Sequence, residues 1–108
     1  MEFSLDDVPD VVADRIRAAT GEPQYLTIRR AGEWIIEALT GDRVIVMRLE
    51  LEDDQSMSEQ TDTFLVHSIE RIDAAPEATV TVKTSAQGFT LPISTEFAHM
   101  LVSARRGN

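Results

Sequence analysis

The chain has 108 residues, of which 43% are hydrophobic, and a formal net charge of −9 from nineteen acidic and ten basic residues. It contains no cysteine, which excludes disulfides, thiolate nucleophiles and thiolate metal sites. Its negative charge repels nucleic-acid phosphate and anionic membrane surfaces, so we expect no direct contact with nucleic acid or membrane.

The length fits one domain with one hydrophobic core, and no shift in composition divides the chain. We therefore expect a single domain over residues 1–108. The N-terminus carries acids where a signal peptide carries bases, and the apolar runs are only a few residues long, which predicts a cytoplasmic protein.

The first predicted element is a helix over about residues 8–20, where apolar residues recur at helical spacing and Val11 widens their stripe. Asp7 suits the N-cap of this helix, and Gly21 suits a left-handed stop. Acids before and within the first turn also complement the positive end of the helix dipole.

Three strands are predicted over about residues 24–30, 33–39 and 43–51, because the apolar period changes from helical spacing to two. Short turns at 31–32 and 40–42 separate them. The third strand is apolar on one face and half apolar on the other, which predicts a central position in the sheet.

Residues 52–62 hold five acids and no base, and they show no apolar period. This composition predicts a mobile, solvated loop in which Met57 is an exposed apolar residue. A strand over about 63–70 follows, although residues 68–75 could instead form a short helix.

Turns at 73–77 and 85–88 separate two further predicted strands, over about 79–84 and 89–93. A C-terminal helix is predicted over about 95–106. The order predicts an α+β domain with an antiparallel, curved or partly closed sheet of about six strands in meander order, flanked by an N-terminal and a C-terminal helix.

Residues suited to catalysis or metal binding are scattered. His67 and His99 lack metal-binding spacing, and the acids of 52–62 lack the spacing of an EF-hand. Glu50 and Glu52 would lie about 7 Å apart on one strand face, a separation that glycosidases can use, but nineteen acids produce such pairs by chance. We therefore expect no catalytic residue, no metal and no cofactor.

Tyr25 and Trp34 fall on neighbouring predicted strands, near Arg29 and Arg30. The group is either an aromatic and arginine anchor for a partner or a core tryptophan with arginines on the solvated face. The second interpretation is favoured.

Residues 69–104 combine the run Thr79–Thr84, the run Gly88–Ile93 and a closing helix. This stretch resembles the end of a bacterial PH-like domain, and it is also loosely similar to the LytTR type of DNA-binding domain. The LytTR resemblance implies a basic DNA-binding face, which the net charge of −9 opposes. The stretch covers a third of the chain, and we assign membership in neither family.

The leading hypothesis is a small, acidic, non-catalytic binding protein, of the inhibitor or immunity type, that docks on a basic protein partner. Its candidate partner-binding residues are Asp6, Asp7, Asp10, Asp14, Glu50, Glu52, Asp53, Asp54, Met57 and Glu59. The alternative is a structural or scaffold module resembling a bacterial PH-like domain. Such a module would assemble through a sheet edge or the C-terminal helix, which leaves a homo-oligomer open.

Overall fold

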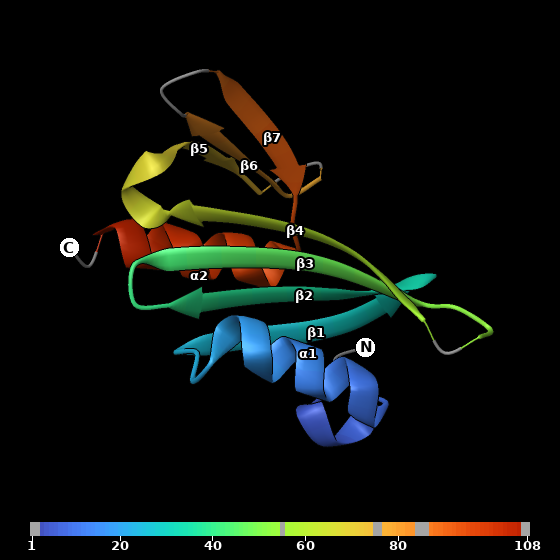
Figure 1. Cartoon of the computed structure of the whole chain (residues 1–108). Helices are drawn as coiled ribbons and strands as arrows, with labels where there is room; N and C mark the ends of the chain where they lie inside the picture. Colours follow the sequence, from blue (N-terminus) through green and yellow to red (C-terminus); the bar gives the residue numbers. More distant parts are fainter. Residues whose placement is uncertain (1–2, 55, 75–76, 84–86, 107–108) are drawn as a thin grey trace. The chain divides into compact units, whose positions relative to one another are not determined.

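The computed structural model describes residues 3–54, 56–74, 77–83 and 87–106 (Figure 1). Its helices are η1 (Leu5–Asp7), α1 (Asp10–Thr20), η2 (Val66–Ser68) and α2 (Thr95–Arg106). Its strands are β1 (Tyr25–Ala31), β2 (Glu33–Thr40), β3 (Arg43–Leu51), β4 (Met57–Leu65), β5 (Ile69–Asp73), β6 (Thr79–Lys83) and β7 (Gly88–Pro92).

The chain folds as two compact units, residues 1–63 and residues 64–108, which we call the first and the second unit. The expectation of a single domain stays a prediction. The strands form two antiparallel sheets, one in the order β1-β2-β3-β4 and one in the order β5-β6-β7. The α+β class is therefore confirmed, whereas the single sheet of about six strands is wrong.

The sheet divides because the strand predicted over 63–70 is interrupted by η2. Val66 and Ile69 are both buried, and they are three residues apart. A 3₁₀ turn places residues i and i+3 on the same side, whereas a continuous strand would point this pair to opposite faces. The spacing of two apolar residues thus favours the turn over a continuous strand.

In the first unit, α1 packs on one face of the sheet (Figure 1). Val12 and Ile16 of the helix and Ile36 and Met47 of the sheet are fully buried in this core. β3 lies between β2 and β4, so the predicted central position of this strand is confirmed.

The start of α1 differs from the prediction. Asp7 closes the short turn η1 by accepting hydrogen bonds from the backbone N–H and the hydroxyl of Ser4, both at 3.0 Å, and Pro9 is the N-cap of α1. Val11 is 41% exposed and does not belong to the buried stripe. Gly21 ends the helix with φ of +61°, as predicted.

The predicted loop over 52–62 is wrong from Met57 onward, because β4 begins there and forms the edge of the four-stranded sheet. Only a short turn joins β3 to β4, closed by the backbone N–H of Glu52 donating to the carbonyl of Ser56 at 2.8 Å. Edge strands tolerate charged and polar side chains on both faces, which protect the open edge from other strands. For this reason the strand carries no apolar period that a sequence pattern can detect.

In the second unit, Val80 and Val82 of β6 and Phe97 and Leu101 of α2 are fully buried. The alternate face of this sheet is polar, with the hydroxyls of Thr81 and Thr90 3.1 Å apart across β6 and β7. β7 is an edge strand, which is where a proline is tolerated. Parts of the turns predicted at 73–77 and 85–88 fall at 75–76 and 84–86, outside the described residues.

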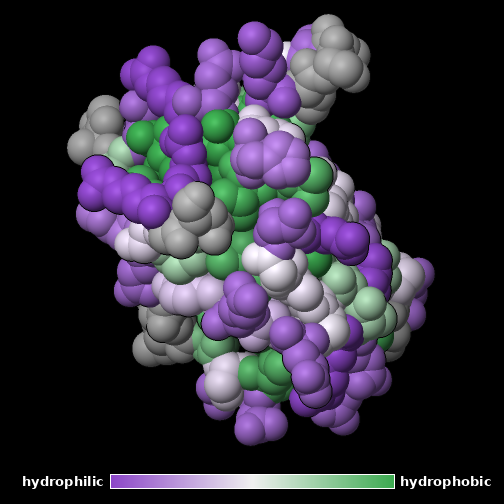
Figure 2. Space-filling view, turned by 90° about the vertical axis from the view of Figure 1, so that its left-hand side faces the viewer, coloured by the Kyte–Doolittle hydropathy of each residue, from purple (hydrophilic) through white to green (hydrophobic). Residues whose placement is uncertain are grey.

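Neither α1 nor α2 is long and apolar enough to cross a membrane, and the other helices of the described residues are single turns. Figure 2 shows one side of the molecule, where hydrophilic residues cover most of the surface and apolar residues are visible between them.

Candidate functional site

All ten candidate partner-binding residues lie in the first unit, and the nine acids among them are exposed. Residues 1–63 contain fifteen acidic and six basic residues, a formal charge of −9, whereas residues 64–108 contain four of each. The net negative charge of the chain therefore belongs entirely to the first unit.

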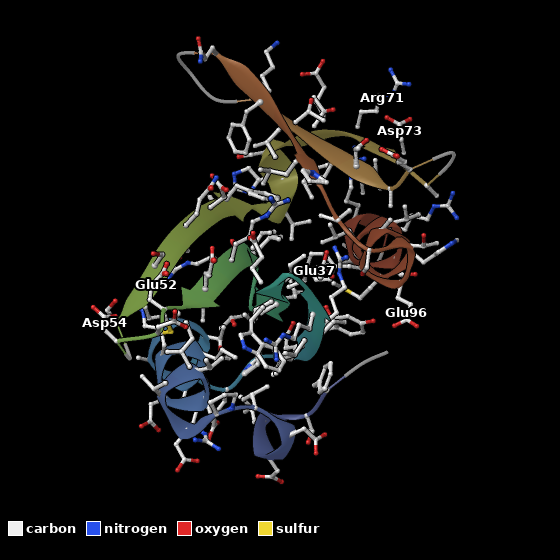
Figure 3. All side chains as sticks on the ribbon, turned by 90° about the vertical axis from the view of Figure 1, so that its right-hand side faces the viewer. Glu37, Glu52, Asp54, Arg71, Asp73 and Glu96 are labelled. Carbon is white, nitrogen blue, oxygen red and sulfur yellow. The ribbon has the colours of Figure 1, made fainter. Side chains whose placement is uncertain are left out.

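Two of the candidate acids also shape the backbone locally. Asp7 is held by Ser4, and Asp54 accepts a hydrogen bond from the backbone N–H of Ser56 at 3.0 Å. In each case hydrogen bonds to the ionised carboxylate lower its pKa: the backbone N–H of Ser4 contributes most at Asp7, and the hydroxyl of Ser56 contributes most at Asp54. Figure 3 shows Asp54 close to Glu52 in the turn between β3 and β4.

Glu59 forms an ion pair that joins β4 to α1. Both of its carboxylate oxygens accept hydrogen bonds from Arg15, with 2.7 Å between Arg15 Nη2 and Glu59 Oε2. The hydroxyl of Thr61 donates to Glu59 Oε2 at 2.6 Å. These hydrogen bonds, first from Arg15 and then from Thr61, hold the pKa of Glu59 below its usual value, and the same pair raises the pKa of Arg15.

Met57 is not the exposed apolar residue that the sequence predicts. It is half-buried and packs against the apolar core of the first unit. This position follows from β4, because a strand residue that alternates with exposed neighbours points into the sheet's packed face. Met57 therefore supports the fold and leaves the acids as the candidate surface.

The acids that remain after Asp7, Asp54 and Glu59 differ in their contacts. The carboxylate of Asp14 lies 3.7 Å from Arg17, and Glu52 accepts a hydrogen bond from Ser58 at 3.2 Å. Of these remaining acids, Asp6, Asp10, Glu50, Glu52 and Asp53 have no ion pair among the described residues.

Two hollows lie where β2 begins and β3 ends, and the sequence patterns did not identify them. The first hollow has a volume of about 250 Å³ and is lined by Glu33, Arg48, Glu50, Ser58, Glu59 and Gln60. The second hollow has a volume of about 180 Å³ and is lined by Pro9, Arg30, Gly32, Glu33, Trp34, Leu49, Glu50 and Leu51.

Glu33 and Glu50 line both hollows. Their positions opposite each other follow from the register of the β2–β3 hairpin. Trp34 pairs with Leu49, and the next residues toward the open end of the hairpin are Glu33 and Glu50. The tight turn after Thr40, which pairs with Arg43, sets this register. The turn and the strand lengths were the sequence signal that could have placed these two carboxylates opposite each other.

Trp34 lines the second hollow and is only 5% exposed. Phe3 packs edge-on against it, with ring centroids 5.1 Å apart, and the guanidinium of Arg30 lies 4.9 Å from the centre of the indole. The prediction of a core tryptophan is confirmed. Tyr25 pairs with Leu39 at the far end of the hairpin, so the structure does not bring Tyr25 and Trp34 together.

Glu37 is a fully buried carboxylate in the middle of β2 (Figure 3). The hydroxyl of Thr27, its cross-strand partner, donates to Glu37 Oε1 at 2.8 Å, and Arg29 Nη2 lies 3.8 Å from Glu37 Oε2. Sequence patterns gave this residue no role, although a lone acid within an apolar strand is the signal of a buried polar group that needs partners. Its contacts stabilise the β1–β2 hairpin.

Within the described residues no three histidine or acidic side chains are grouped so that they could hold a metal ion. Comparisons with protein-family models, curated proteins and solved structures found no match to this chain.

Proposed function

We propose that the protein is a small, cytoplasmic, non-catalytic binding protein that docks on a basic protein partner through the acidic surface of its first unit. An inhibitor or an immunity-type protein works in this way, by covering a functional basic surface of its target. Neither a cofactor nor a metal takes part.

The observation that carries the proposal is the division of charge. A chain that used acidic residues only for solubility would need no particular distribution, yet the first unit holds a net charge of −9 and the second unit is balanced. The field of a unit with this charge attracts and orients a partner of opposite charge before contact.

The exposed acids of the β3–β4 turn and of the start of α1 belong to one end of the first unit. Pro9, which precedes α1, and Leu51, which ends β3, line the same hollow, the second of the two. Asp10 and Glu52 are therefore the sequence neighbours of two residues that line one hollow. Both segments support a continuous acidic surface.

The test is an affinity capture from host lysate at low salt, eluted in salt steps and identified by mass spectrometry. Three proteins are compared: the wild type, the variant D6N/D10N/D53N, and the matched control E70Q/E77Q/E96Q, which removes three exposed acids from the second unit. We expect a basic protein to elute at moderate salt from the wild type and the control, and to be lost from the first-unit variant.

Two outcomes would contradict the proposal. In the first, the captured protein resists salt. In the second, both variants retain it equally. Recovery of the chain itself as the main binding partner would instead favour the scaffold module that assembles through a sheet edge or α2.

A further inference from the structure

We infer that residues 3–7, which we call the latch, keep the open edge of β1 from pairing with the β1 edge of a second copy of this chain. With the latch closed the protein is a monomer, and with the latch open two copies join through β1 into one continuous sheet. The inference concerns self-association and does not depend on the proposed binding of a basic partner.

The latch lies against β1, an edge strand of the four-stranded sheet (Figure 1). The backbone N–H of Phe3 donates to the carbonyl of Ile28 at 2.8 Å. The ring of Phe3 packs edge-on against Trp34, with centroids 5.1 Å apart, and Leu5 packs against the same core. The latch therefore occupies a backbone acceptor and an apolar surface at the edge where a further strand would add.

The hydrogen bond from Phe3 identifies which backbone groups of β1 face the open edge. In an antiparallel strand, the N–H and the C=O of one residue point to the same side, and this side alternates along the strand. Because the carbonyl of Ile28 faces the latch, the backbone groups of Leu26 and Arg30 also face the open edge. Opening the latch thus frees a row of donors and acceptors that another strand can pair with.

The sequence of β1 permits pairing with a second copy about a twofold axis at Ile28. In this antiparallel register, Ile28 lies opposite Ile28 of the other copy, and Leu26 lies opposite Arg30. Thr27 lies opposite Arg29, so no two arginines stand directly opposite each other. Leu26, Ile28 and Arg30 would each exchange backbone hydrogen bonds with the other copy.

The latch can open without breaking its own hydrogen bonds. Ser4 and Asp7 bond to each other within η1, where the backbone N–H and the hydroxyl of Ser4 donate at 3.0 Å. Residues 8–9 join η1 to α1 in extended conformation, with ψ of 159° and 146°. Opening therefore removes the contacts of Phe3 and Leu5. One backbone hydrogen bond and one edge-on aromatic pair together favour the closed latch by about tenfold or more.

The experiment compares the wild type with F3P, F3A and the control D6N by sedimentation equilibrium over a range of protein concentrations. F3P removes the N–H donor and the ring, F3A removes the ring alone, and D6N changes an exposed latch residue that makes neither contact. Trp34 is the only tryptophan of the chain, so its emission reports whether the latch is closed. Amide hydrogen exchange of Leu26 and Ile28 reports pairing of the β1 edge.

We expect F3P to form a dimer at concentrations where the wild type and D6N are monomers. Both copies must open their latches before they pair, so a tenfold preference for the closed latch enters twice, and F3P should dimerise about a hundredfold more tightly than the wild type. F3A should lie between them. The emission of Trp34 should shift to longer wavelength in F3P, and the amides of Leu26 and Ile28 should exchange more slowly as its concentration rises.

Salt separates this inference from the proposed function. The first unit of each copy carries a formal charge of −9, so two copies repel each other and added salt should strengthen the F3P dimer. The same salt should weaken the binding of a basic partner. Opposite responses to salt therefore identify the two associations as separate.

Equal self-association of F3P and the wild type, with F3P folded by far-UV circular dichroism, would overturn the inference. So would an unchanged emission of Trp34 in F3P. A dimer of F3P in which Leu26 and Ile28 exchange as fast as in the monomer would do the same, because another surface would then join the copies. If F3P does not fold, F3A decides by the same criteria. None of these outcomes affects the capture of a basic partner, which tests the proposed function alone.

Discussion

Removing the ion pair between Arg15 and Glu59 should weaken the attachment of β4 to α1. The pair has two parallel hydrogen bonds, and the side chains are 36% and 27% exposed, so solvent screens part of the attraction. We expect a coupling free energy of about 0.5–1 kcal/mol, the upper half of the range for surface pairs, because the geometry is bidentate.

The assay is a double-mutant cycle with R15M, E59Q and the double variant, in which the free energy of unfolding is measured by urea denaturation. Asp14 and Arg17 provide the control cycle, since they lie 3.7 Å apart with side chains 80% and 54% exposed. Their coupling should be close to zero, about 0.3 kcal/mol or less.

The coupling should also depend on pH. The pKa of Glu59 is lowered in the folded state from an ordinary value of 4.5, first by Arg15 and then by Thr61. A lowered carboxyl pKa contributes stability that is present above the unfolded pKa and is lost as the pH falls through the folded pKa. We therefore expect full coupling at neutral pH and a decline below pH 4.5. A coupling equal to the control cycle, or one unchanged between neutral pH and strongly acidic pH, would refute the reasoning.

Three further substitutions test the packing of the two units, each measured by urea denaturation. Thr27→Val should lower the free energy of unfolding by about 1–3 kcal/mol, because it removes the hydroxyl that donates to the buried carboxylate of Glu37; a neutral result would mean that water replaces the hydroxyl. Gly21→Ala should cost about 1 kcal/mol through backbone strain alone, since φ is +61° and a Cβ there would meet no atom within 4 Å. Phe97→Ala should cost about 3–5 kcal/mol, because Phe97 is fully buried in the second unit; a loss below about 1 kcal/mol would show that this core is loosely packed.

The elements with a strong apolar period were predictable from the sequence. α1, β1, β2, β3 and α2 appear close to their predicted bounds, because each buries a regular row of side chains in its own unit. β4 was missed because its buried or half-buried apolar residues are only Met57 and Phe64, which are separated by six polar residues and so form no alternating row. Local pattern cannot distinguish such an edge strand from a solvated loop.

The candidate site was predictable in composition but not in geometry. The acids were identified by counting, and their exposure agrees with that expectation. The assignment of Asp7 to a turn, of Glu59 to Arg15 and of Met57 to the core depends on contacts between residues that are distant or locally bent, which composition does not encode. That Glu33 and Glu50 lie opposite each other could have been predicted from the hairpin register alone, because the turn at 40–42 sets that register.

The most direct test of the central claim is the association rate of the first basic protein captured from lysate, measured against ionic strength. Between about 0.01 M and about 0.15 M the screening length falls from about 30 Å to about 8 Å. If the charge of the first unit steers binding, the rate should fall by about tenfold or more over this range, and D6N/D10N/D53N should already associate slowly at low salt. A rate that is insensitive to salt and equal for the wild type and this variant would contradict the account.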